Sequence, residues 1–441
     1  MNKNIKLAVA GAVLALSATA ANAGIIIPAG EWTVDLNGNV NSFATWTRAT
    51  GDAGVKGGGI YGAYDYNDTS TKTDSNLTTG LLPNYLGVTG TTRQNDLDVS
   101  FTISINPGSS TKQSGIQSAN QENRQAFLTF GDKSWGSVLI GKNIGLFAQD
   151  AILNDMTLLG VGRGAGGLAG NTTTTGRIGS GFMYADWKNQ INYSTPNFGG
   201  FQGTVGISQA WNAWSIADPV TTTTGTVLND GTVGTGSSAV TFGSTSTSGR
   251  SASSTGRGGA SPALDYKLSY SFAANDVTGK VWTSGTRQQV KHLSVGRDTD
   301  AWAADVGANL NAAGFGLTGY YYGGEGIGQT HQLLDGFSAV DGAKRDSNGG
   351  YVQATYVLPT KTKLGVAWGQ SNLDAANAAD TAGNTEDTLW TVGLYHPLTK
   401  HLNLVAEYND AEHKVDSSSG SNAGNGKAKA RGVSLGAILF F

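Results

Sequence analysis

The sequence contains no cysteine among its 441 residues. This absence excludes a disulfide framework and any metal site built on thiolates. Only 14% of the residues are charged and the net charge is -3, so the chain offers no large basic field for nucleic acid. The body of the chain also lacks an apolar run of about 18 residues, which excludes a helical membrane span. A large, fully hydrogen-bonded sheet could hold such a chain together without covalent links.

The N-terminal residues have a character of their own. Lys3 and Lys6 precede an apolar run from Leu7 to Leu16, and the small-x-small sequence Ala21-Asn22-Ala23 follows. This order is typical of a secretory signal peptide, whereas the run is too short for a membrane anchor. We therefore expect a signal peptide at residues 1–23 and a mature domain at residues 24–441.

A period of two residues dominates the mature chain. In LDVSFTISI (97–105), every second side chain is apolar and those between are polar. A strand sends successive side chains to opposite faces, so this segment has one apolar and one polar face. Similar patterns predict about sixteen strands, near 32–48, 82–92, 97–105, 124–130, 136–142, 182–195, 201–210, 264–273, 278–287, 301–310, 315–323, 349–358, 362–370, 387–396, 402–408 and 430–441.

The connections between these strands alternate in length. Short turns such as PNFGG (196–200) and PTK (359–361) alternate with long, polar segments such as 143–181 and 211–262. Transmembrane barrels have short periplasmic turns, long external loops and an even number of strands. The alternation thus predicts an all-β, closed antiparallel transmembrane barrel with lipid outside and water inside. A linker between two domains is the alternative for 211–262, but the matching strand patterns on both sides favour a loop.

The chain ends on a strand. Counting back from Phe441, the residues on the same face are Leu439, Ala437 and Leu435. An apolar edge strand would invite aggregation in a soluble protein, whereas in a closed barrel the last strand pairs with the first.

At the level of motifs, the chain resembles the trimeric general porins of Gram-negative outer membranes. AFLTFGDKSWGSVLIGKN (126–143) and INYSTPNFGGFQGTVGIS (191–208) resemble porin strand–turn–strand units, and Phe441 fits the C-terminal signature. The resemblance implies an outer-membrane channel for passive diffusion of small hydrophilic solutes and ions. It also implies a homotrimer in contact with outer-membrane lipids, whose C-terminal strand is presented to the barrel-assembly machinery. The second external loop, 106–123, would reach over the neighbouring barrel.

The predicted constriction lies in the third external loop, 143–181. Its segment QDAILNDM (149–156) resembles the start of the porin loop that folds into the pore, and its apolar residues would need a wall to pack against. Asp150 and Asp155 would then face basic side chains across a narrow gap. Opposed charges in such a gap create a transverse electric field. With two acids and three bases, the sequence does not predict whether the channel prefers cations or anions. The basic residues proposed for the gap are Lys142, Arg177 and Arg163.

Lys142 presents a difficulty, because strict alternation puts it on the same face as Val138 and Ile140, which are assigned to lipid. Either Gly141 carries a bulge that resets the alternation, or the strand has left the membrane there.

Two other functions are alternatives to the diffusion channel. A substrate-specific channel of eighteen strands could carry a slide of aromatic side chains, for which Tyr320, Tyr322 and Tyr351 are candidates. A barrel enzyme would need a Ser, His and Asp or Glu cluster near the outer rim, and the long loops show no convincing one. We therefore expect no enzyme activity, cofactor or metal. Asp335, Asp341 and Asp346 make an acidic, glycine-rich loop, for which a weak divalent-ion site is the alternative; the EF-hand spacing is absent, so we expect this loop to be solvated. We expect the same of the histidines, which are His292, His331, His396, His401 and His413.

Overall fold

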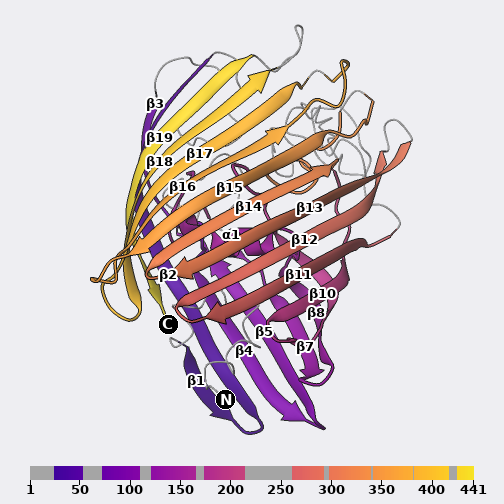
Figure 1. Cartoon of the computed structure of the whole chain (residues 1–441), viewed down its shortest axis with the longest axis vertical. Helices are drawn as coiled ribbons and strands as arrows, with labels where there is room; N and C mark the ends of the chain where they lie inside the picture. Colours follow the sequence, from indigo (N-terminus) through magenta and orange to yellow (C-terminus); the bar gives the residue numbers. More distant parts are fainter. Residues whose placement is uncertain are drawn as a thin grey trace, which may run out of the picture.

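The computed structural model describes residues 24–52, 72–109, 121–164, 173–213, 261–292, 297–338, 341–380, 382–416 and 425–441. These residues form one continuous antiparallel sheet that closes on itself (Figure 1). The predicted signal peptide at 1–23 lies outside the described residues. Among the residues described, no helix has the length and apolar character that a membrane crossing requires.

Among the described residues, sixteen strands build the wall of the barrel and three further ones extend it. The three further strands are β1 (Ile25–Ala29), β3 (Lys72–Thr78) and β6 (Gln121–Glu122). The wall strands are β2 (Trp32–Gly51), β4 (Tyr85–Gln94), β5 (Leu97–Pro107), β7 (Ala126–Asp132), β8 (Gly136–Ile144), β9 (Trp187–Ser194), β10 (Phe201–Ser208), β11 (Ala263–Ala274), β12 (Val277–His292), β13 (Arg297–Ala312), β14 (Phe315–Glu325), β15 (Asp346–Val357), β16 (Lys363–Leu373), β17 (Asn384–Pro397), β18 (Leu402–Asp416) and β19 (Gly426–Phe440).

The barrel is closed by β19 and β2. Their register runs from Gly51 opposite Ala428 to Asn39 opposite Phe440. Beyond the strand end, the backbone of Phe441 exchanges two hydrogen bonds with Gly38, at 2.8 and 3.0 Å. No edge strand is left at this seam, so the predicted closed sixteen-stranded barrel is confirmed.

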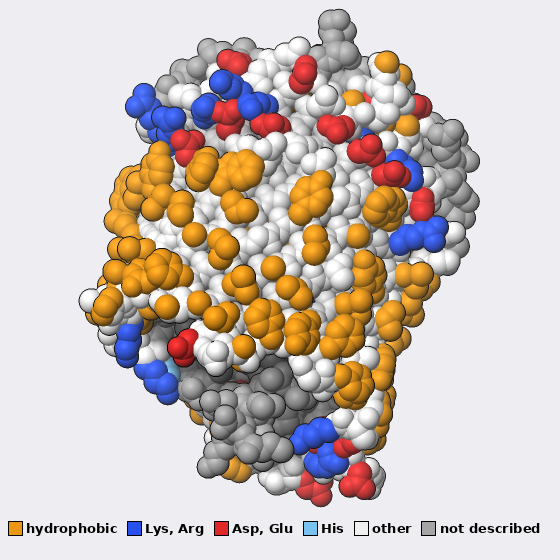
Figure 2. All heavy atoms as spheres, viewed as in Figure 1, with side chains coloured by type: hydrophobic (Ala, Val, Ile, Leu, Met, Phe, Trp, Pro, Cys, Tyr) orange, Lys and Arg blue, Asp and Glu red, His pale blue; other side chains and the backbone are white. Residues whose placement is uncertain are grey.

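The two faces of the wall follow the period of two. On β5, Ile103 and Ile105 are exposed while Thr102, Ser104 and Asn106 between them are buried on the inner side. On the face shown in Figure 2, exposed apolar side chains form a broad band between charged groups at its upper and lower margins. The apolar band therefore faces lipid and the polar positions face the lumen, as the alternation predicts.

Some sequence-based boundaries shift in the structure. The predicted strand at 278–287 is part of a longer strand, β12, whereas residues 182–186, predicted as strand, belong to the connection before β9. The segment 211–262 lies largely outside the described residues, but the strands that flank it, β10 and β11, pair directly with each other. It therefore joins neighbouring strands of one sheet.

The last strand matches the predicted outer face. Leu435 and Leu439 are exposed and Ala437 is half-buried. Ile438 and Phe440 point the other way and are buried inside the barrel. These two apolar side chains on the lumen side are exceptions to the alternation of apolar outer and polar inner positions, and they belong to a buried apolar cluster inside the barrel.

Candidate channel constriction

The connection between β8 and β9, residues 145–186, folds into the barrel; we call it loop 3. It contains the short helix α1 (Gln149–Asn154) and the 3-10 helix η3 (Met156–Leu159). Figure 1 shows α1 inside the ring of strands. Apolar loop residues, among them Phe147, Ile152 and Met156, are buried in one cluster with wall residues such as Tyr351. The predicted inward fold of this loop is therefore confirmed; its residues 165–172 lie outside the described part.

The first anchor of loop 3 joins its start to strands β11 to β13. Asp150 forms ion pairs with Lys267 of β11, at 3.6 Å, and with Lys280 of β12. Asp305 of β13 accepts a hydrogen bond from the Ala148 amide at 3.1 Å. Burial alone would raise the pKa of the Asp150 carboxyl, but the two ammonium groups outweigh it and hold that pKa below its ordinary value.

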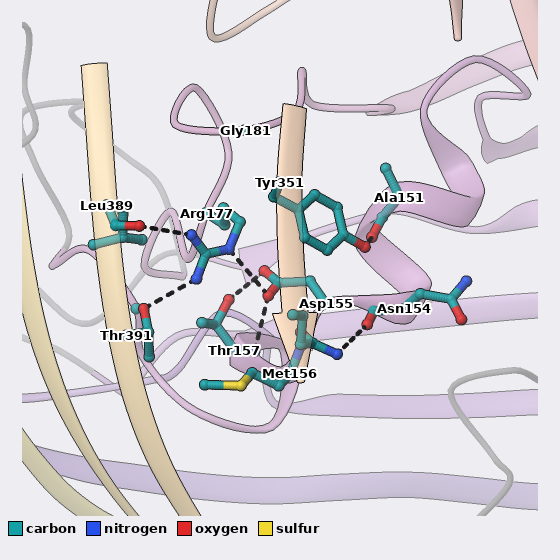
Figure 3. A network of polar contacts seen from close by, with 12 residues as sticks. Ala151, Asn154, Asp155, Met156, Thr157, Arg177, Gly181, Tyr351, Leu389 and Thr391 are labelled. Atoms are coloured by element: carbon teal, nitrogen blue, oxygen red, sulfur yellow. Dashed lines mark hydrogen bonds and ion pairs between the residues drawn. The ribbon is translucent and has the colours of Figure 1, made fainter. Parts of the chain in front are cut away.

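The second anchor is neutral and joins the loop to β15. The Tyr351 hydroxyl donates to the Ala151 carbonyl at 2.8 Å (Figure 3). The Gln353 amide donates to the Asn154 carbonyl and accepts from the Met156 amide, at 3.0 and 2.7 Å. These bonds satisfy backbone groups around the end of α1, which a helix end would otherwise leave unpaired.

The third anchor centres on Arg177, whose side chain is fully buried. Its guanidinium donates to the Leu389 carbonyl at 2.9 Å and to the Thr391 hydroxyl at 3.1 Å, both on β17 (Figure 3). It also lies 3.4 Å from Asp155. Asp155 caps η3 by accepting from the Thr157 amide. One arginine thus connects both described halves of the loop to the wall.

The fourth anchor is Glu407 on β18. Its carboxylate accepts hydrogen bonds from the Val161 and Gly162 amides, at 2.8 and 2.9 Å, and from the Tyr395 hydroxyl at 2.7 Å. Gly162 has a φ of 58°, in the left-handed region that favours glycine. Gly162 therefore allows a turn that brings two backbone amides within hydrogen-bond distance of the Glu407 carboxylate.

The structure brings four of the five predicted constriction residues into loop 3 or onto its anchors. Asp150, Asp155 and Arg177 act as described. Arg163 donates to the Ser180 hydroxyl at 2.6 Å and lies 4.0 Å from Asp387 of β17. All four side chains are almost completely buried, and their contacts hold the loop in place.

The fifth residue, Lys142, does not join this group. It is exposed, pairs with Asn189 of β9, and donates to the Asn123 carbonyl at 2.7 Å. The register from Ile140 to Lys142 is continuous, so Gly141 introduces no bulge that would reset the faces. Lys142 therefore shares the outer face of Ile140, and the prediction that it faces Asp150 across the gap is not supported.

Sequence reasoning missed the wall partners of the loop. Lys267, Lys280, Asp305 and Glu407 carry the contacts that the loop residues need. The sequence pattern could have pointed to three of them. Lys267, Asp305 and Glu407 occupy polar positions in strands where apolar and polar residues alternate, and these positions face the lumen. Charge at a lumen-facing position marks a wall residue that meets either water or an inward loop.

The aromatic slide and the histidines also differ from expectation. Tyr320, Tyr322 and Tyr351 face inward, but all three are buried, and Tyr351 packs edge-on against Phe182 of loop 3 at 5.8 Å. They support the loop instead of lining an open path. His413, expected to be solvated, is buried with its Nδ1 2.9 Å from Asp387.

Comparison with known proteins agrees with this architecture. The profile of the family described as Gram-negative porin matches residues 8–416. No curated protein matches the chain. Similar solved structures include the outer membrane channel DcaP of Acinetobacter baumannii, with 18% identity and a TM-score of 0.60 over 95% of this chain and 100% of that one. Another is the anion-selective porin from Comamonas acidovorans, with 17% identity and a TM-score of 0.55 over 93% and 100% of the two chains. OmpF of Salmonella typhi, solved with daunomycin, has 14% identity and a TM-score of 0.53 over 93% and 100%.

At these identities the structural likeness concerns the fold, whereas the family profile covers nearly the whole chain. The chain therefore belongs to the Gram-negative porin family, as an outer-membrane barrel that forms a water-filled channel for the passive diffusion of small hydrophilic solutes and ions.

Proposed function

We propose that loop 3 forms the constriction of this channel and that the Asp150 cluster, with Lys267 and Lys280, sets its ion preference. The observation that carries the proposal is that Asp150 reaches from the loop to two lysines on neighbouring wall strands. Lys280 remains 30% exposed at its side chain, so this cluster has a face toward solvent. Asp155 and Arg177 are fully buried and serve mainly to position the loop.

Two ammonium groups against one carboxylate leave this cluster with a positive balance. Replacing Asp150 by Asn removes the carboxylate that pairs with both lysines, and we expect the reversal potential in a salt gradient to shift toward anions. Replacing Lys280 by Gln should shift it toward cations, because the carboxylate then meets one fewer cation. Planar-bilayer recordings measure both shifts. The fields of buried charges are screened less than those of surface charges, so the shifts should persist at physiological salt.

The matched control is Asp132→Asn. Asp132 lies at the end of β7 beside a short turn. Its carboxylate pairs with the exposed Arg93 at 3.0 Å and accepts from Ser134 at 2.9 Å, and both partners lie outside loop 3. This substitution should leave the reversal potential unchanged. If Asp150→Asn and Lys280→Gln behave like this control, the Asp150 cluster does not lie on the ion path.

We also infer that the protein is a homotrimer, from its membership of the family. The predicted contact loop, 106–123, has residues 110–120 outside the described part. Arg124 and Gln125, which directly follow this loop, are buried in their own barrel, where Arg124 pairs with Glu122 at 2.8 Å. We therefore assign the intermolecular contact to the residues before them. Deleting 110–120 should convert a trimer into folded monomers in mild detergent, as measured by light scattering; a monomeric unmodified protein would refute the assignment.

Three further proposals concern export, assembly and catalysis. Residues 1–23 would be removed on export, and the outer face of β19, with Phe441, Leu439, Ala437 and Leu435, would be read by the barrel-assembly machinery. We propose no catalytic role. Among the described residues, the His413–Asp387 pair resembles two members of a catalytic triad. Asp387, however, also accepts a hydrogen bond from Gln329 at 3.0 Å and lies 4.0 Å from Arg163. This pair belongs to the network that holds the inward loops.

A further inference from the structure

A second external connection also turns inward. It joins β14 to β15 and comprises residues 326–345, of which 339 and 340 lie outside the described part; we call it the 326–345 loop. A loop that projects into the medium would be solvated, yet every described residue of this loop is buried or half-buried. Its apolar residues Ile327, Leu333, Leu334 and Phe337 are all buried. The expectation of a solvated segment therefore fails for the body of this loop, although Asp335 and Asp341 are only half-buried and Asp346, at the start of β15, is exposed.

The 326–345 loop is bonded to the inner face of the wall. Gln329 donates to the Ser371 carbonyl of β16 at 2.9 Å and to the Asp387 carboxylate of β17 at 3.0 Å. It also accepts from the Thr385 hydroxyl at 2.7 Å. One glutamine side chain thus uses both its donor and its acceptor groups within the barrel mouth. At the far end of the loop, Arg345 forms a buried ion pair with Asp380 at 2.6 Å.

The same loop is bonded to loop 3. The Tyr184 amide donates to the Thr330 carbonyl at 2.9 Å. The Gln332 amide donates to the carbonyls of Tyr184 and Ala185, at 3.2 and 3.3 Å, and the Tyr184 and His331 rings meet edge-on at 5.6 Å. At Gly179, a side chain would collide with Thr330. The C-terminal half of loop 3 is therefore covered by the 326–345 loop on one side and held by the wall on the other.

We propose that the 326–345 loop is a second constriction element, which sets the size limit of the channel together with loop 3. It occupies space inside the mouth of the barrel and holds residues 179–185 of loop 3 in place. The proposal rests on the assignment of loop 3 as the constriction, and adds a determinant of solute size that is separate from the charged Asp150 cluster.

The geometry of the β14–β15 hairpin allows the 326–345 loop to be shortened without disturbing the two strands. Gly326 and Arg345 are joined by a backbone hydrogen bond of 2.9 Å, directly above the last pair of the β14–β15 ladder, Glu325 opposite Asp346. Residues 327–344 can therefore be replaced by Asn-Gly, a sequence that favours a two-residue hairpin turn. The register of β14 and β15 is kept, and the barrel wall stays intact.

The test compares swelling rates of liposomes in sugars of increasing size, and single-channel conductance, for the full chain and the shortened one. We expect the shortened protein to admit larger sugars relative to the smallest one, and to conduct more. Gln329→Ala should shift both readouts in the same direction with the loop retained, which guards against misfolding of the shortened chain. Gln370→Ala is the matched control, because Gln370 of β16 makes two side-chain bonds, to Asn372 and Glu386, that involve neither loop.

An unchanged size limit in the shortened protein and in Gln329→Ala would overturn the proposal, as would a lower conductance. This failure is distinguishable from failure of the loop 3 assignment. The Asp150 variants report on reversal potential, and the 326–345 variants report on the size of admitted solutes.

Discussion

Replacing Arg177 by Met is expected to lower the free energy of unfolding by about 3–5 kcal/mol, the cost of removing one partner from a buried ion pair. Arg177 is the side chain on which both described halves of loop 3 depend. Without it, the Asp155 carboxylate stays buried with Thr157 as its remaining donor, and Leu389 and Thr391 lose their bonds to the loop. We expect channel currents to become unsteady as well, because the C-terminal half of loop 3 loses a link to β17.

Urea unfolding in lipid vesicles, followed by tryptophan fluorescence, measures the stability change. Arg287→Met is the matched control, since Arg287 forms an exposed ion pair with Asp300 at 2.9 Å outside the lumen. Such a pair contributes about 0–1 kcal/mol. Equal losses for the two variants would mean that burial of Arg177 has no energetic consequence, and would contradict the anchoring role.

Replacing Leu435 by Lys is expected to cost about 2–4 kcal/mol, the range for lysine at the bilayer midplane of a barrel. Leu435 is 47% exposed in the middle of the outer face of β19, between Ala44 and Ala406 of the neighbouring strands. An ammonium group there would lie in hydrocarbon with no partner. The same urea titration measures the effect.

Leu398→Lys provides the control for this substitution. Leu398 follows β17 in a short turn and is 54% exposed, so a lysine there meets water. We expect little change in stability. A loss at position 398 as large as that at position 435 would argue against a lipid-facing band on the outside of β19.

The sequence by itself determined the wall of this protein. The period of two in segments such as 97–105 assigns each side chain to lipid or lumen, because a strand has only two faces. Lys142 marks the limit of this assignment: strict alternation places it on the outer face but leaves a bulge at Gly141 open, and the unbroken register through Gly141 in the structure decides for the outer face.

Only the tertiary structure decided which side chains meet inside the barrel. Asp150 and Asp155 look alike in the sequence, yet Asp150 meets two lysines from strands more than one hundred residues away, while Asp155 meets Arg177 of its own loop. The inward turn of the 326–345 loop was likewise decided only by the tertiary structure. Its glycines and acids are typical of a solvated loop, and its burial follows from bonds to β16, β17 and loop 3. Local periodicity carries no information about such pairings, because they depend on the curvature of the closed sheet and on where two flexible segments find complementary partners.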